Sequence, residues 1–158
     1  VSYVLINQAK QKIPNTPGTK MVNPMNAELI APCGINCRVC RFHMKAKNPC
    51  PGCRDSHISG HCLNCKLRNC GKFSGGDSGY CTDCDEFPCR LVKQLDKRYR
   101  TKYSASPIAN LLGIKTGGMA AFLESEGQKW TCPTCGGIIC MHEPNCPSCG
   151  EARHAFDL

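Results

Sequence analysis

Residues 62–70 read CLNCKLRNC, and residues 81–89 read CTDCDEFPC. Both segments place their cysteines at the spacing Cys-x2-Cys-x4-Cys. Two cysteines three positions apart on a turn direct both sulfur atoms at one ion, and the third thiol follows about one helical turn later. The two segments therefore predict six thiolate ligands for a paired metal centre.

Cysteine makes up 16 of the 158 residues, a proportion typical of chains built on disulfides or on metal. The N-terminal segment does not read as a secretory signal, because its apolar run covers only Tyr3–Ile6 and its lysines follow that run. No later segment is long and apolar enough to cross a membrane. We therefore expect a cytoplasmic protein with reduced or metal-bound thiols, in which metal helps a small core to fold.

The formal net charge of +8 counts every cysteine as neutral. A zinc ion held by four thiolates carries about −2, so three or four such sites would bring the folded protein to roughly zero to +2. Net charge therefore gives no indication of a nucleic-acid partner, and only a local basic patch would.

The C-terminal motifs are CPTCGG at 132–137 and CPSCGE at 146–151. Glycine after the second cysteine tolerates a left-handed backbone, which lets nearby amides face the thiolates. Two such motifs predict a zinc ribbon whose single ion is held by Cys132, Cys135, Cys146 and Cys149. Between the motifs, we interpret Cys140 as a buried thiol and His142 as an imidazole outside the ligand set.

The N-terminal motifs add CGINCRVC at 33–40 and CPGC at 50–53 to the two quoted first. Their candidate metal ligands are Cys33, Cys37, Cys40, Cys50, Cys53, Cys62, Cys65, Cys70, Cys81, Cys84 and Cys89. These eleven are one fewer than three tetrahedral sites need, so a histidine could complete the set: His43, His57 or His61. Alternatively, two all-cysteine sites form and three thiols stay free. The pairing is open, because either neighbouring or alternate motifs could share an ion.

We expect three to four zinc ions in the whole chain. The alternative cofactor is an iron–sulfur cluster in the N-terminal block, with zinc only in the ribbon. Closely spaced cysteines are compatible with both, although the Cys-Pro step that often follows the last cluster ligand is absent here.

Helical periodicity predicts a helix over 88–103, with Pro88 in its first turn. Its apolar stripe consists of Leu91, Val92, Leu95 and Tyr99. A second helix should begin after the cap Ser106, with Pro107 at its first position, and stop at Gly113. A third should end at Gly127 and bury Met119, Phe122 and Leu123.

The expected fold class is a small metal-stapled α+β protein. It combines an irregular cysteine-rich zinc-knuckle block, two or three helices and a C-terminal zinc ribbon. We divide the chain into a flexible N-terminal tail (1–26), a multi-metal block (27–90), a helical segment (91–129) and the ribbon (130–158).

Enzyme signatures are missing from the sequence. It contains no His-Glu-x-x-His, phosphate-binding loop, dinucleotide fingerprint or nucleophile elbow. The spacing of Cys33, Cys37 and Cys40 matches radical-SAM cluster loops, but this chain lacks the length and pattern of their barrel. CPGC imitates half of a zinc-deaminase signature without its His-x-Glu half. We therefore name no catalytic residue and favour a non-enzymatic interaction module.

One basic stripe is the best candidate for contact with a partner. It lies on the helix expected at 88–103 and consists of Arg90, Lys93, Lys97 and Arg100. The stripe would suit RNA, DNA or an acidic protein face. The alternative interpretation is the ordinary solvated side of an amphipathic helix.

Taken in order, the four N-terminal motifs resemble a cysteine-rich microbial family known as domain of unknown function 3795. The family pattern runs Cys-Gly-x-x-Cys-x-x-Cys, Cys-x-Gly-Cys, Cys-x4-Cys and Cys-x-x-Cys-x-Glu-Phe-Pro-Cys, and DEFPC at 85–89 is the most specific match. Some members are also similar in a C-terminal Trp-x-Cys-Pro-x-Cys-Gly-Gly ribbon, as at 130–137. The resemblance covers roughly residues 30–150. It implies a cysteine-rich metal-binding fold and no particular activity.

Overall fold

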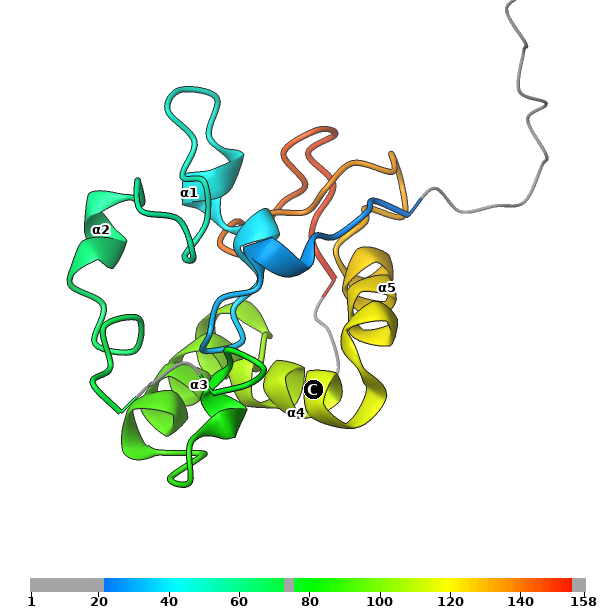
Figure 1. The fold of residues 1–158 in the computed structure, drawn as a ribbon. Coiled ribbons are helices and arrows are strands. Elements are labelled where there is room, and N and C mark those ends of the chain that lie inside the picture. The colour runs from blue at the N-terminus through cyan, green and yellow to red at the C-terminus, as the bar shows by residue number, and fades with distance from the viewer. Residues whose placement is uncertain (1–21, 73–75, 155–158) are drawn as a thin grey trace, which may run out of the picture.

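The computed structural model describes residues 22–72 and 76–154. Its helices, in chain order, are η1 (Ala27–Leu29), η2 (Cys37–Val39), α1 (Arg41–Met44), α2 (Gly60–Leu63), η3 (Cys81–Asp83), α3 (Arg90–Tyr103), α4 (Pro107–Gly117) and α5 (Met119–Lys129). In Figure 1, α3 and α4 lie along the lower edge, α5 rises on the right, and the C-terminal loops lie above them. The fold is mostly helical, with long irregular loops.

The β part of the expected α+β class is very small. Within the described residues it consists of three isolated antiparallel bridges: Ile30 with Asn36, Thr131 with Ile138, and Asn145 with Ala152. Each bridge closes a tight turn whose two arms are too short to extend into a ladder. Cysteine-bearing turns, rather than strands, therefore make up the non-helical half of the molecule.

The α3 helix buries the apolar stripe that its periodicity predicts. Val92 and Leu95 are buried, and Leu91 and Tyr99 pack against them from partly exposed positions. The helix begins at Arg90 with Cys89 as its N-cap residue, so the prediction of Pro88 in the first turn is wrong by two positions. A proline at that point still fixes the chain direction just before the helix.

The α4 and α5 helices each run past the glycine predicted to end them. Ser106 caps α4 as expected, because its hydroxyl accepts the N–H of Ala109 at 3.0 Å. Gly113 does not stop α4, since a glycine inside a helix costs only about 1 kcal/mol and Ile114 beyond it packs on the core. The helix ends instead at Gly118, whose φ of 82° favours glycine.

Two hydrophobic clusters hold these elements together. The first joins the cysteine-rich block to the helices through Ile30, Val92, Leu111 and Phe122, among others. The second surrounds Trp130, which is 1% exposed. Ile35 and Tyr99 pack against both clusters, so the C-terminal loops share a continuous apolar interior with the N-terminal block.

Buried polar groups link distant parts of the chain. Asp96 on α3 is 6% exposed and accepts hydrogen bonds from the hydroxyl of Ser106 (2.6 Å) and the N–H of Ile108 (3.1 Å), which orients the start of α4. Most of the expected tail, residues 1–21, lies outside the described residues. Asn23, near its end, donates to the hydroxyl of Thr131 and to the carbonyl oxygen of Gly136. Within the described residues, none of the helices has the length and apolar content that crossing a bilayer requires.

Candidate metal centres

The two C-terminal cysteine motifs form turns with the same backbone pattern. In the first, Gly136 N–H donates to the carbonyl oxygen of Cys132, and Cys132 N–H donates to that of Gly137. In the second, Gly150 and Cys146 make the equivalent pair of bonds, with Glu151 as the second acceptor. Gly136 and Gly150 have φ angles of 73° and 76°, a left-handed conformation that favours glycine. The Cys-Pro-x-Cys-Gly pattern therefore folds into two equivalent knuckles.

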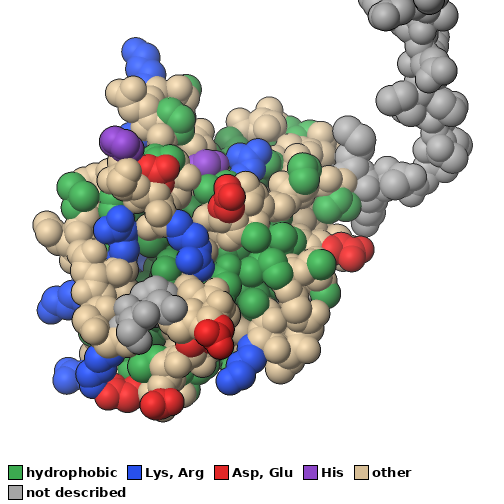
Figure 2. Space-filling model, in the orientation of Figure 1, with side chains coloured by type: hydrophobic (Ala, Val, Ile, Leu, Met, Phe, Trp, Pro, Cys, Tyr) green, Lys and Arg blue, Asp and Glu red, His purple; other side chains and the backbone are tan. Residues whose placement is uncertain are grey.

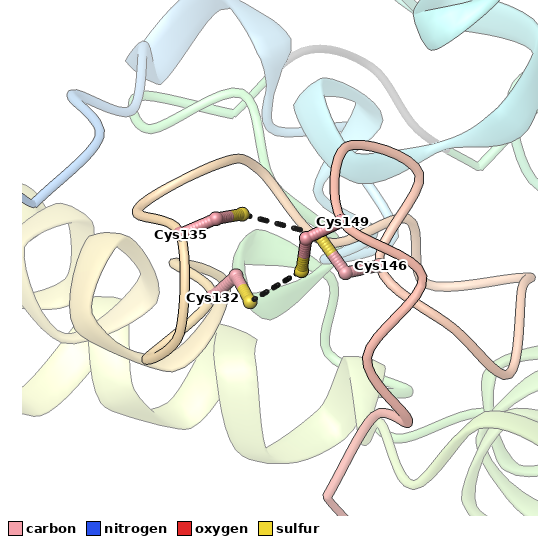
Figure 3. A group of neighbouring side chains, drawn as sticks. All are labelled: Cys132, Cys135, Cys146 and Cys149. Atoms are coloured by element: carbon pink, nitrogen blue, oxygen red, sulfur yellow. Dashed lines mark hydrogen bonds between the residues drawn. The ribbon is translucent and has the colours of Figure 1, made fainter.

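The four cysteines of these knuckles point their sulfur atoms at one another (Figure 3). All four Sγ atoms lie within 4.8 Å of one another. The Sγ–Sγ distance is 3.7 Å both for Cys132 with Cys149 and for Cys135 with Cys146. Four Zn–S bonds of about 2.3 Å directed to tetrahedral corners would separate the sulfurs by about 3.8 Å. The group therefore has the dimensions of a site for one ion with four sulfur ligands.

The electrostatics of this group also favour a cation. Backbone N–H groups of Cys135 and Thr134 lower the pKa of the Cys132 thiol to about 6. The N–H of Glu151 acts in the same direction on Cys149, but the neighbouring thiols outweigh it and the pKa of Cys149 rises to about 12. The pKa values of Cys132 and Cys149 differ because thiolates this close repel one another. The backbone N–H groups stabilise one thiolate, whereas four thiolates together need a positive charge between them.

Cys140 and His142 lie outside this four-sulfur group. Cys140 is 3% exposed, as its interpretation as a buried thiol predicts, and burial raises its pKa. His142 packs edge-to-face on Tyr103, with ring centroids 4.7 Å apart, and its Nδ1 accepts the N–H of Arg41 at 3.4 Å. Burial lowers the pKa of His142 to about 4. His142 thus connects the C-terminal loops to Arg41 on α1 and Tyr103 on α3.

Six N-terminal cysteines line one cavity of about 410 Å³. They come from three motifs: Cys33, Cys37, Cys40, Cys53, Cys62 and Cys65. The pKa values of Cys33 and Cys37 are raised, that of Cys37 to about 12, mainly by burial and with a contribution from the nearby Cys53 thiol. Cys50 belongs to the same neighbourhood, since its charge acts on Cys37, Cys40 and Cys62. The motif at 33–40 thus meets both the neighbouring motif at 50–53 and the alternate motif at 62–70, so the cavity does not select between the two open pairings.

A second N-terminal group surrounds Cys81. The pKa of Cys81 is raised to about 11, mainly by burial and in addition by the nearby thiols of Cys89, Cys70, Cys84 and Cys65. Cys70 is the last cysteine of CLNCKLRNC, yet it does not line the cavity that Cys62 and Cys65 line. The cavity thus takes two of the three cysteines of the first segment and none of the second, so the repeated spacing is not repeated in the cavity lining.

Neither N-terminal group brings its sulfur atoms as close together as the C-terminal group does. Among the described residues, which include all 16 cysteines, only the C-terminal four form a set of three or more metal-ligating atoms within 4.8 Å of one another. The candidate histidines are also spread out. His43 Nδ1 bonds to the carbonyl oxygen of Cys50, His57 is exposed, and His61 stacks on Phe42 at the cavity wall.

Sequence reasoning missed the non-cysteine wall of the cavity. Its apolar part includes Phe42, Leu95 and Tyr99, and two cationic side chains, Lys66 and Arg98, also line it. The sequence contained one indication of this wall, the position of Arg98. Arg98 follows Leu91 by seven positions and Leu95 by three, so it lies on the same side of α3 as these apolar residues.

The basic stripe on α3 is solvent-exposed. Arg90, Lys93, Lys97 and Arg100 are all exposed, and the last three line a shallow hollow of about 300 Å³ together with Ile108. Arg100 lies 3.7 Å from the carboxylate of Asp96. On the face drawn in Figure 2, Lys and Arg side chains alternate with acidic and uncharged ones instead of forming one broad patch.

The comparisons with known proteins bear on the cysteine-rich block. Residues 29–94 match a family model described as protein of unknown function (DUF3795). This agrees with the resemblance seen in the motifs from Cys33 to Cys89, and the match ends within α3, before the C-terminal knuckles. No curated protein and no solved structure gives a significant match to the chain. The block is therefore similar to an uncharacterised family that carries no assigned activity.

Proposed function

We propose that this chain is a zinc-binding protein whose C-terminal ribbon holds one structural Zn²⁺ through Cys132, Cys135, Cys146 and Cys149. The convergence of the four Sγ atoms within 4.8 Å carries this proposal. Four sulfur ligands complete a tetrahedral shell, so no position remains for a reacting water or substrate. Zinc at this point therefore stabilises the fold and performs no catalysis.

The ribbon zinc would stabilise more than its own two knuckles. Cys132 and Cys146 are 3% exposed and belong to the apolar cluster around Trp130. Met141 N–H, between the knuckles, donates to the carbonyl oxygen of Val39 at 2.8 Å. An ion that fixes the knuckles would thus also fix the surface on which the N-terminal block packs.

For the folded chain we propose a role as a non-enzymatic interaction module, with the exposed basic side of α3 as its contact surface. Lys93 and Lys97 line the hollow beside Ile108 and are exposed. Two cations beside an apolar side chain suit a phosphate backbone or an acidic peptide. A second candidate function, a redox protein with an iron–sulfur centre in the N-terminal block, is favoured by the cavity that six cysteines line.

The zinc site is tested by Cys149→Ser. Cys149 is exposed, so the serine removes a ligand and little buried surface. We expect the variant to bind one zinc ion fewer per chain in native mass spectrometry under reducing conditions. Roughly the last twenty residues should lose protection from hydrogen exchange, because structural zinc contributes folding free energy directly. Ser148→Ala, in the same turn, is the matched control. Equal zinc content in Cys149→Ser and wild type would contradict the site.

The interaction surface is tested by the double variant Lys93→Ala/Lys97→Ala. A fluorescent single-stranded RNA and poly-glutamate serve as probes, with affinity measured against salt concentration. Loss of two phosphate contacts should reduce the salt slope of RNA binding by about 1 to 2. Lys45→Ala/Lys47→Ala removes two exposed lysines elsewhere and controls for total charge. An unchanged slope, or no binding of either probe, would make the stripe an ordinary solvated helix face.

A further inference from the structure

The six cysteines that line the cavity stand too far apart to hold a single metal ion. Thiolates on one zinc ion stand about 3.8 Å apart because their bonds meet at one centre. The C-terminal group has that spacing, whereas no three cavity thiols lie within 4.8 Å of one another among the described residues. Yet these thiols surround a single space of about 410 Å³. Their arrangement suits an occupant that contains several metal atoms of its own.

The cavity wall has the chemistry of an iron–sulfur site. Each thiolate of such a cluster binds a different iron atom, so the cysteine sulfurs stand further apart than on one ion. Leu95, Phe42 and Tyr99 make part of this wall apolar. A cubane of two Fe²⁺, two Fe³⁺, four S²⁻ and four thiolates carries a charge of about −2. Lys66 and Arg98 place two positive charges at the same wall.

We propose that this cavity binds one [4Fe–4S] cluster, with four ligands drawn from Cys33, Cys37, Cys40, Cys53, Cys62 and Cys65. Each ligating thiol loses one proton to solvent as its sulfur binds iron. The site shares no ligand with the ribbon zinc site, so loss of the cluster and loss of the zinc are measured separately. Six thiols exceed the four that the cluster needs, and the two spare cysteines lie beside it. Cys70, Cys81, Cys84 and Cys89 do not line this cavity.

The experiment compares two matched triple variants of the full chain. Cys53→Ser/Cys62→Ser/Cys65→Ser leaves three cavity thiols, and Cys70→Ser/Cys84→Ser/Cys89→Ser removes three from the other group. Each protein is purified without oxygen and reconstituted with equimolar ferrous and ferric iron and sulfide. We expect wild type and the second variant to bind about four iron and four labile sulfide per chain and to absorb near 400 nm. The first variant should lose at least about tenfold of both.

Zinc content reports whether the first variant still folds, because the ribbon ion is bound elsewhere. If that variant also loses its zinc, cysteine footprinting of wild type decides the question. The cluster should protect the cavity thiols from alkylation, relative to the same protein after cluster removal, and leave Cys70 unaffected. Zinc without labile sulfide in wild type, cluster loss only in the second variant, or protection confined to the Cys81 group would each overturn the proposal.

Discussion

Glu126 joins three parts of the chain through one oxygen atom. Its side chain is on α5 and the residue is 4% exposed. Oε2 accepts a hydrogen bond from Asn36 Nδ2 and another from Trp130 Nε1, both at 2.9 Å. The buried carboxylate therefore holds the turn at Asn36 in the N-terminal block beside the indole that begins the ribbon. Buried donors of this kind are costly to leave without an acceptor.

Replacing Glu126 should destabilise the protein according to how many acceptors remain. Glu126→Ala removes the oxygen that accepts from Asn36 and Trp130, and we expect the free energy of unfolding to fall by about 2–4 kcal/mol. Glu126→Gln keeps an amide oxygen at that position and should cost about half as much. Denaturant titration of the metal-loaded proteins measures both, with exposed Glu124→Ala as control. Equal losses for the two Glu126 variants would show that charge, not acceptor geometry, matters there.

At the scale of elements, two glycines inside helices have different surroundings. A Cβ added at Gly113 in α4 would meet only Phe122 Cδ2, at 3.8 Å, an ordinary contact. A Cβ added at Gly127 in α5 would lie 2.8 Å from Val22 Cγ1 and 2.9 Å from the backbone oxygen of Asn23. Gly127 is therefore required by the close approach of the segment at residues 22–23, whereas Gly113 is not required by packing.

These surroundings predict opposite effects of the same substitution. Gly113→Ala should raise the free energy of unfolding by about 0.5–1 kcal/mol, because alanine loses less conformational freedom in a helix. Gly127→Ala should lower it, since the backbone at Asn23 must move and its hydrogen bonds to Thr131 and Gly136 weaken. Thermal unfolding of the pair under identical metal loading measures the difference. Destabilisation by Gly113→Ala would show that α4 needs a glycine for another reason.

At the scale of the whole molecule, apolar packing and thiol placement act together. The two hydrophobic clusters meet at Ile35 and Tyr99, and cysteines from both halves of the chain belong to them. The cluster around Trp130 contains Cys132 and Cys146 together with Val39, so the C-terminal knuckles pack against the N-terminal block. Metal bound to thiolates would also reduce the formal charge of +8, which makes local cations more informative about partners than the total.

Local features could be predicted from the sequence wherever one short segment sets its own geometry. The knuckles at Cys132 and Cys146 and the cap at Ser106 depend on neighbours within a few residues, and the apolar stripe of α3 is visible as a helical period. Helix ends were harder to predict. Gly113 and Gly127 both resemble helix stop signals in the sequence. In the structure the helices continue past them, where Ile114 packs on the core and residues 22–23 lie against Gly127. Because glycine has no side chain, the sequence does not indicate which close contact the glycine allows.

The sequence by itself determined that four C-terminal cysteines would converge, because each pair lies on one tight turn and the two turns are alike. Only the tertiary structure decided how the eleven N-terminal cysteines divide. Cys62 and Cys65 line the cavity and Cys70 does not, although all three belong to the motif CLNCKLRNC. The spacing of cysteines in the sequence determines which thiols a single turn can bring together. Grouping across turns depends on how α3 and the loops pack around a shared apolar interior, and that packing is a property of the whole chain.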